Sequence, residues 1–395
     1  MQRTISFFLA LSLILCLFAG CGPQEPAADP EASATTEATP PVTTTAPTTE
    51  PTTEPTTEPT TESVSEDVYD MKIALITHGE GEEGTQMAWQ GIENFAEERG
   101  ISYNYYKTTE ESGDEAMVSI AEAVKDGANV LIFCGYMFEC VVYDAQRLYP
   151  DVSFLLLNGE AHTPDYCSYE TASNTQCILF REEQMGYLAG YAAVMEGYRT
   201  IGVLLSIEIP IMVYAYNRFL QGATDAAIKL GVVDEIHIKQ HILTCDCGMA
   251  PGDIGSLLEG WIDGEVELIY CIGSSADRKI CGGIGSKNVP VISVITDRVY
   301  GATVIGAFVY DYTSAVELAL TILENGNGEW PEGNSTMYLG AEENGIRLLP
   351  DGEGWKFRNF TEEDYKALYA EIAEGKIIIP RTFEIGEMPL AVEYT

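Results

Sequence analysis

The sequence predicts an α/β protein with two doubly wound lobes, each built on a mainly parallel sheet, and a ligand cleft between the lobes. Short apolar runs typical of buried strands alternate with amphipathic stretches typical of helices, in two separate series. The chain has 395 residues, and the part after residue 66 is too large for a single typical core. With 46% apolar and 21% charged residues, the chain has the composition of a soluble globular protein.

The first series of predicted elements begins with a strand over 72–77 and ends with a strand over 152–157. Between these two strands we expect helices over 85–98, 115–125 and 137–148, and strands over 101–106 and 129–133. Gly100 directly follows the first of these helices and fits the end of a helix.

The second series begins with a predicted strand over 201–206 and ends with one over 289–295. Between them we expect helices over 213–230, 256–262 and 277–286, and strands over 235–243 and 266–272. In parallel sheets ligands bind beyond the carboxyl ends of the strands, so the segments that follow the strands are expected to line the cleft.

Residues 1–20 have the features of a lipoprotein signal peptide. Arg3 precedes an apolar run that is shorter than the roughly 20 residues needed to span a bilayer. Phe18-Ala-Gly-Cys21 resembles a bacterial lipobox, so Cys21 is expected to carry acyl chains and to anchor the protein in the membrane. The alternative is plain secretion, with cleavage nearby and no role for Cys21.

Residues 21–66 are predicted to form a disordered linker. The segment consists almost entirely of Pro, Thr, Ala, Ser and Glu, and Pro-Thr-Thr-Glu occurs four times between residues 47 and 62. Such a composition cannot bury enough apolar surface to fold. We expect it to hold the folded body away from the membrane.

The net charge argues against nucleic acid as a partner. The chain has 61 Asp and Glu against 21 Lys and Arg, a formal charge of -40, which repels phosphate backbones. A G-x-G-x-x-G pattern spans Gly79 to Gly84, but three of its residues are glutamates, placed where a pyrophosphate would sit. No nucleotide cofactor is therefore expected.

The histidines and cysteines do not predict a metal site. His237, His241, Cys245 and Cys247 are close in sequence, but the two histidines lie on a predicted strand, where residues four apart are about 13 Å apart. An even number of cysteines follows Cys21, so disulfides are possible although their pairing is not defined. Cysteines 245 and 247 are the best candidates for bridges to cysteines elsewhere in the chain.

Two other cysteines are expected to be free. Cys134 and Cys271 end predicted strands in apolar surroundings and are typical of buried free thiols. No G-x-S-x-G follows a strand, and no histidine has a nucleophile close by in sequence. We therefore expect a protein that is not an enzyme, and an enzyme ranks third among the functions considered.

Several motifs in order resemble one family. Phe180-Arg-Glu-Glu-Gln-Met-Gly-Tyr-Leu-Ala-Gly190 is similar to that family's F-x-x-x-E-x-S-Y-L-A-G, and Ala88-Trp-Gln-Gly-Ile92 to its A-W-E-G-L. Tyr149-Pro-Asp-Val152 is similar to its Y-P-D-V. From residue 71 to 380 the chain resembles the basic membrane protein family of ABC-transporter solute receptors, of the purine nucleoside type. The resemblance implies a type I periplasmic-binding-protein fold.

The family's ligand-binding positions are only partly kept. His78 stands where the family has Asp, and Asn158 stands where the family often has Asp. Ala215 stands where the family has an aromatic residue, and in this chain a tyrosine lies on each side of it. The resemblance and the strand ends together suggest the ligand-binding residues His78, Gln86, Tyr136, Asn158, Tyr214, Ser274 and Asp297.

The expected function follows from this resemblance. We expect lobe 1 to cover approximately residues 67–199 and 312–345, and lobe 2 residues 200–311 and 346–395. The protein is expected to be lipid-anchored on the extracytoplasmic face of the cell membrane and to deliver a small, nucleoside-like ligand to the permease of an ABC importer. The alternative is a ligand-sensing surface lipoprotein coupled to a membrane signalling partner. We expect no cofactor and no metal.

Replacing Cys21 tests the lipid anchor. Cys21→Ser removes the thiol that would carry the acyl chains, so the protein should move from the detergent phase to the aqueous phase in a Triton X-114 partition. Cys167→Ser, in the folded body, is the matched control and should stay in the detergent phase. Retention of the Cys21 variant in the detergent phase would refute lipidation.

Overall fold

The computed structural model describes the part of the chain that follows the predicted linker. The described residues are 69–78, 83–108, 113–205, 208, 210–242, 251–273, 289–294, 303–331, 335–349, 355–386 and 388–395. The chain divides into two units, residues 1–64 and 65–395, and every described residue belongs to the second. The predicted signal peptide, the linker and Cys21 lie outside the described residues. None of the described helices has the length and apolar character needed to cross a bilayer.

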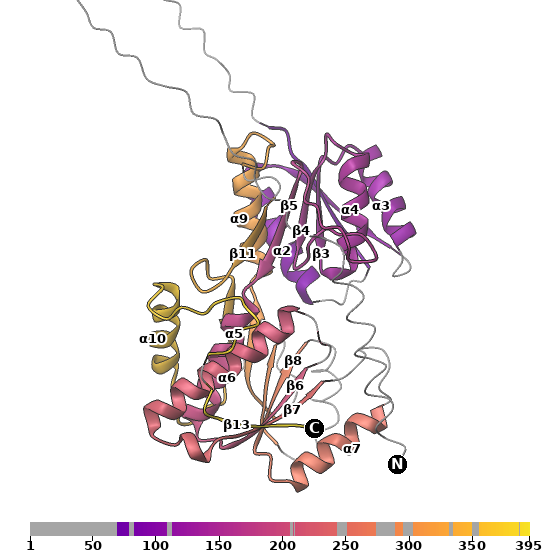
Figure 1. The fold of residues 1–395 in the computed structure, drawn as a ribbon. Helices are drawn as coiled ribbons and strands as arrows, with labels where there is room; N and C mark the ends of the chain where they lie inside the picture. The colour runs from indigo at the N-terminus through magenta and orange to yellow at the C-terminus, as the bar shows by residue number, and fades with distance from the viewer. Residues whose placement is uncertain are drawn as a thin grey trace, which may run out of the picture. The chain divides into compact units, whose positions relative to one another are not determined.

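Two β-sheets form the framework of the described body (Figure 1). The first sheet consists of β1 (Lys72–Thr77), β2 (Ser102–Lys107), β3 (Val130–Cys134), β4 (Ser153–Leu157), β5 (Thr175–Phe180) and β11 (Thr336–Leu339). Its order is β11-β5-β4-β3-β1-β2, and all its neighbouring strands are parallel.

The second sheet has the order β12-β10-β9-β8-β6-β7-β13. Its strands are β6 (Thr200–Leu205), β7 (His237–Ile242), β8 (Leu268–Ile272), β9 (Val291–Val294), β10 (Val304–Tyr310), β12 (Ile346–Leu348) and β13 (Ala391–Tyr394). Only β12 runs antiparallel to its neighbour. The two sheets confirm the predicted α/β class with mainly parallel strands.

The described helices include every helix predicted for these residues, with some differences at their ends, and also three that the alternation did not predict. They are α2 (Glu83–Arg99), α3 (Gly113–Lys125), α4 (Glu139–Leu148), α5 (Glu182–Glu196), α6 (Pro210–Leu230), α7 (Pro251–Asp263), α9 (Tyr312–Asn325) and α10 (Glu362–Ala373), with the 3-10 turns η1 (Tyr136–Phe138) and η2 (Val233–Glu235). The three that were not predicted are α5, α9 and α10. The helix predicted over 137–148 is divided between η1 and α4. The helix predicted over 277–286 lies outside the described residues.

Both faces of the first sheet are buried, which explains the continuous apolar runs in the sequence. In β1, Ile73 and Leu75 belong to the apolar cluster that includes α2 and α9. Ala74 and Ile76 point the other way, into the cluster that includes α3 and α4. Figure 1 shows these two pairs of helices on opposite sides of the sheet. A strand covered on both faces needs apolar residues at every position.

Helix α5 is buried on all sides, and neither it nor the preceding β5 is predicted from the sequence pattern. Every residue from Glu183 to Val194 is buried. The helix therefore shows no polar stripe, and without a stripe the period of 3.6 residues that marks an amphipathic helix is lost.

The burial of α5 results from its close contact with α6 (Figure 1). A Cβ atom added to Gly186 would lie 2.0 Å from the carbonyl oxygen of Ala215, and one added to Gly190 would lie 2.0 Å from that of Phe219. From the other helix, a Cβ on Gly222 would lie 2.0 Å from the oxygen of Tyr187. The two helices thus touch through their backbones, and only glycine fits at these three positions.

The last residue of α5 holds the segment that precedes α10. The buried carboxylate of Glu196 accepts hydrogen bonds from the backbone N–H groups of Arg358, Asn359 and Phe360, at 2.8 to 3.0 Å. Three N–H donors compensate the loss of water around a buried charge. Glu196 therefore ties the C-terminal part of the chain to α5.

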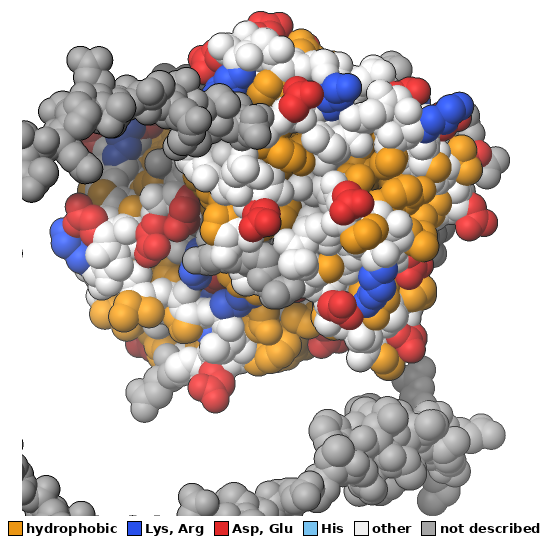
Figure 2. Space-filling view, turned by 90° about the horizontal axis from the view of Figure 1, so that it is seen from above, with side chains coloured by type: hydrophobic (Ala, Val, Ile, Leu, Met, Phe, Trp, Pro, Cys, Tyr) orange, Lys and Arg blue, Asp and Glu red, His pale blue; other side chains and the backbone are white. Residues whose placement is uncertain are grey.

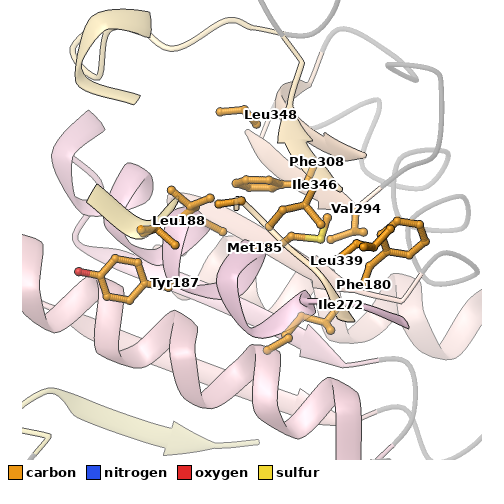
Figure 3. Close-up of a cluster of buried hydrophobic side chains, with 14 of the residues drawn as sticks. Phe180, Met185, Tyr187, Leu188, Ile272, Val294, Phe308, Leu339, Ile346 and Leu348 are labelled. Atoms are coloured by element: carbon orange, nitrogen blue, oxygen red, sulfur yellow. The ribbon is translucent and has the colours of Figure 1, made fainter. Parts of the chain in front are cut away.

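Side chains from the two sheets meet in one apolar cluster at α5 (Figure 3). Phe180 and Leu339 come from the first sheet, and Val294 and Phe308 from the second. Met185 of α5 lies with them in Figure 3. The two sheets of the described body thus share a core.

The carboxylates are dispersed on the one face of the body that Figure 2 shows. In the face shown in Figure 2, the Asp and Glu side chains are scattered and do not form one patch. A dispersed negative charge favours solubility and does not create a localised site for a cationic partner.

Substitution of Gly190 tests the contact between α5 and α6. Gly190→Ala forces two helix backbones apart, so we expect it to lower the free energy of unfolding by about 3 kcal/mol or more. Gly260→Ala is the matched control, because Gly260 lies in α7 with nothing within 4 Å of a Cβ placed there. The control should be neutral or stabilising by about 0.5–1 kcal/mol. Urea denaturation measures both, and equal effects would contradict the packing argument.

Candidate functional site

Three predicted ligand-binding residues follow neighbouring strands of the first sheet. His78 follows β1, Tyr136 comes after β3, and Asn158 directly follows β4. Strands β1, β3 and β4 are adjacent and parallel, so their carboxyl ends lie at one edge of the sheet. We call this the strand-end edge. In parallel α/β sheets this is the edge where ligands bind.

His78 is held in place by two neighbours. Its Nδ1 lies 2.6 Å from the hydroxyl oxygen of Thr108, which follows β2. Its ring stacks on Phe138 with the centroids 4.2 Å apart and the planes 3° from parallel. Phe138 is itself buried, so the imidazole is attached to a rigid support. A histidine fixed in this way is suited to contact a ligand with little loss of side-chain entropy.

Tyr136 and Asn158 stand at turns that the backbone makes after β3 and β4. Tyr136 is 64% exposed. It follows Gly135, which has a φ of 94°, a backbone conformation that glycine adopts without strain. Asn158 is half-buried and has a φ of 56°, a left-handed conformation that asparagine tolerates better than most residues. These turns bring both side chains to the strand-end edge.

Gln86 lies near the start of α2, close to the end of β1. The neighbouring Thr85 is buried, and its hydroxyl oxygen lies 3.4 Å from that of Thr77 on β1. The Gln86 side chain is exposed. At Gly84, a Cβ would come within 3.0 Å of the ring of Tyr312, so the start of α9 packs on the start of α2 beside Gln86.

The structure adds a pair of residues that the sequence analysis did not select. Glu182 begins α5 two residues after the end of β5. Its Oε1 accepts a hydrogen bond of 2.6 Å from the hydroxyl of Tyr310, the last residue of β10. The rings of Tyr310 and Phe180 are 4.9 Å apart. The carboxyl ends of β5 in the first sheet and β10 in the second therefore meet at this pair.

The Glu182 carboxyl group is sensitive to pH in the neutral range. Burial raises the pKa of Glu182 to about 7, and the charge of Glu183 adds to the rise. The hydrogen bond from Tyr310 and the charge of Arg381 act in the opposite direction. Perturbed carboxyl groups of this kind are typical of functional sites. A carboxyl group that is partly protonated near pH 7 can either accept or donate a hydrogen bond to a ligand.

Tyr214 lies in a different cluster. Its ring is 4.7 Å from that of Phe383, and the Arg381 guanidinium lies 5.4 Å from it. The same guanidinium lies 4.7 Å from the ring of Tyr338 on β11, and 3.9 Å separates Arg381 Nη1 from the buried Glu183 carboxylate. Tyr214 thus belongs to an arginine-centred contact, and its part in ligand binding stays a prediction.

Two other predicted site residues, Ser274 and Asp297, lie outside the described residues, as do Cys245 and Cys247. His237 and His241 both lie on β7, in agreement with the strand prediction. No group of three or more metal-ligating side chains occurs among the described residues. Cys134 and Cys271 are buried and are not joined in disulfides, which confirms the expectation for these two.

One histidine does have a thiol nearby in space. Cys140 Sγ lies 3.9 Å from His162 Nδ1, and His162 Nε2 lies 2.9 Å from Glu139 Oε2. However, Nδ1 is closer to the carbonyl oxygen of Thr163, at 2.7 Å. Burial, with the charges of Glu139 and Asp144, raises the pKa of the Cys140 thiol. A catalytic cysteine needs the opposite shift, so this group is better explained as a structural cluster.

A family model described as "ABC transporter substrate-binding protein PnrA-like" matches residues 72–387. No curated protein sequence matches the chain.

Solved structures of similar fold are identical to the chain at 16–18% of positions. An ABC transporter solute-binding protein from Conexibacter woesei DSM 14684 has 18% identity and a TM-score of 0.61, covering 80% of this chain and all of its own. A solute-binding protein from Aeropyrum pernix K1 has 16% identity and a TM-score of 0.58, covering 79% of this chain and 94% of its own. A transcriptional activator of the comK gene from Bacillus halodurans has 16% identity and a TM-score of 0.58, covering 80% and 99%.

The Glu182 carboxyl group predicts a pH-dependent stability. Its pKa in the folded protein, about 7, lies above the ordinary 4.5. Its contribution to the free energy of unfolding is therefore complete below about pH 4.5 and is lost as the pH rises toward 7. Glu182→Gln keeps an acceptor for Tyr310 but cannot ionise. The melting temperature of the variant should therefore rise relative to wild type between pH 4.5 and 7.

Glu363→Gln, which removes an exposed carboxylate from α10, is the matched control for this measurement. Melting curves of the three proteins from pH 4 to 9 give the comparison. A difference between Glu182→Gln and wild type that does not change with pH would mean that Glu182 titrates normally.

Proposed function

Since the chain belongs to the family of PnrA-like ABC-transporter substrate-binding proteins, we propose that it binds a small nucleoside-like solute at the strand-end edge and delivers it to an ABC importer. Family membership agrees with the resemblance found in the sequence. It implies a small-molecule ligand and a transporter partner, in a family of binding proteins that are normally not enzymes. The identity of the ligand and the lipid anchor are the parts that we propose.

The observation that carries the proposal is the convergence of polar side chains at the ends of adjacent parallel strands. His78, Tyr136 and Asn158 follow β1, β3 and β4, and Glu182 follows β5. Ligand sites in such folds combine an apolar wall with a few placed polar groups. Ser274 and Asp297, which follow β8 and β9 in the sequence, are proposed to contribute from the second sheet.

A nucleoside fits the chemistry of these residues. A base offers a flat aromatic face, for which the exposed ring of Tyr136 is a stacking surface. The Asn158 amide has both a donor and an acceptor and can pair with the edge of a base. A ribose offers hydroxyl donors, for which the Glu182 carboxylate is an acceptor. Binding requires no covalent step.

The N-terminal residues support a surface-anchored arrangement. The proposed acyl chains on Cys21 would hold the protein at the outer face of the membrane, and the Pro- and Thr-rich linker would allow the binding body to reach a permease. The runner-up is a surface sensor that binds the same ligand and signals to a membrane protein. Uptake of labelled ligand in cells with and without the protein separates the two roles.

Asn158→Gly tests the proposed ligand contact without straining the backbone. Asn158 has a φ of 56°, which glycine adopts freely, whereas alanine would add about 1–2 kcal/mol of strain. A ligand at about 1,000 times its dissociation constant stabilises the native state by about 4 kcal/mol. Purine and pyrimidine nucleosides, then sugars, are screened by thermal shift. The variant should bind about tenfold more weakly, because one ligand polar group loses its partner.

Asn327→Gly is the matched control for this substitution. Asn327 has a φ of 54° and is exposed, two residues after the end of α9. Both variants should melt near the wild-type temperature without ligand, and only Asn158→Gly should show a ligand-induced rise that is smaller than in wild type, by about one third. If a ligand is found and both variants bind it as wild type does, the strand-end edge is not the site.

A further inference from the structure

A hollow beside α10 contains none of the residues expected at the strand-end edge. Its volume is about 340 Å³, near the lower end of the range for small-molecule pockets. One wall is β12, the edge strand of the second sheet, and the opposite wall is α10. Trp355, from the segment between these two elements, also lines it.

The tyrosines of α10 form a fixed aromatic wall. The hydroxyl of Tyr365 accepts a hydrogen bond of 2.9 Å from the backbone N–H of Leu348, and the hydroxyl of Tyr369 donates one of 2.6 Å to the carbonyl of Ile346. These bonds satisfy backbone groups of the edge strand. They also hold the two rings, whose centroids are 5.5 Å apart, and the Trp355 ring lies 5.8 Å from that of Tyr365. A planar ligand would meet three aromatic side chains in a row.

Two basic and two acidic side chains line the hollow, Arg347 and Lys366 with Asp311 and Glu362. Lys366 lies 3.2 Å from Glu362 within α10, and the Asp311 carboxylate accepts the backbone N–H of Ser314 at the start of α9. The Arg347 guanidinium, which lines the same hollow, makes no hydrogen bond or ion pair within the described part of the chain. In a chain with 61 acidic and 21 basic residues, an arginine with no carboxylate partner among the described residues is unexpected.

We propose that this hollow binds a small aromatic carboxylate. The carboxylate of the ligand pairs with Arg347, whose planar guanidinium can donate two parallel hydrogen bonds to it. The ring of the ligand lies against Trp355 and Tyr365. The site is separate from the proposed nucleoside site, and its existence does not depend on that proposal.

The probe for the experiment is 4-fluorobenzoate, with 4-fluorobenzylamine as the probe of opposite charge. Fluorine NMR line broadening on titration into the purified full chain measures binding of each. For a probe of this size we expect a dissociation constant of about 1 mM. The benzylamine, which would face Arg347 with a like charge, should bind at least about tenfold more weakly.

Arg347→Gln should weaken binding of the benzoate about tenfold or more, because the charged hydrogen bonds are lost. Lys376→Gln, an exposed change three residues after the end of α10, is the matched control and should bind as wild type does. Glu182→Gln reports on the strand-end edge and should also leave benzoate binding unchanged. Melting temperatures of all three variants show that the fold is kept.

The proposal is overturned by any of three results. These are no benzoate binding up to 10 mM (about tenfold above the expected constant), equal binding of the benzylamine, or benzoate binding that survives Arg347→Gln. Loss of binding in Glu182→Gln with retention in Arg347→Gln would assign the probe to the strand-end edge and would likewise refute the second site.

Discussion

The backbone contact between α5 and α6 is the constraint on which the rest of the body depends. Gly186, Gly190 and Gly222 each face a carbonyl oxygen at a distance that leaves no room for a side chain. Because the helices touch in this way, α5 is enclosed and its residues from 183 to 194 are buried. The enclosed helix then connects the strand-end edge at its first residue with the segment before α10 at its last.

A glutamate at each end of α5 accepts hydrogen bonds from a distant segment of the chain. At its start, Glu182 receives the Tyr310 hydroxyl and links the ends of β5 and β10. At its end, Glu196 receives three backbone N–H groups and holds residues 358–360. The second contact fixes the segment that leads into α10, and α10 in turn covers the edge strand β12 through its tyrosine hydroxyls. The candidate site and the hollow beside α10 are therefore built on the same helix.

Sequence patterns predicted one half of the candidate site. His78, Tyr136 and Asn158 follow strands that are apolar enough to recognise, so the rule that parallel strands end at one edge was sufficient to group them. Glu182 and Tyr310 were missed for a physical reason. Glu182 follows β5 and Tyr310 ends β10, and neither strand is predicted from the sequence. The pair forms only because the two sheets meet there. The Phe180-Arg-Glu-Glu motif was a signal that could have led to Glu182, since it was already the strongest match to the family. Tyr214 was selected from the sequence but lies in another cluster. Its neighbours there, Arg381 and Phe383, are distant in sequence, so the sequence pattern could not show this contact.

The sequence alone determined the α/β class, the mainly parallel sheets, most strands of the first sheet and the family. Each of these depends on local periodicity or on motifs in order, and both are properties of neighbouring residues. Only the tertiary structure decided the position of α5, the ionisation of Glu182 and the hollow at Arg347. A helix buried on all sides has no polar stripe, and a pKa depends on the burial and charges supplied by distant segments. Arg347 likewise comes to line a hollow only because β12, α10 and Trp355 are brought together.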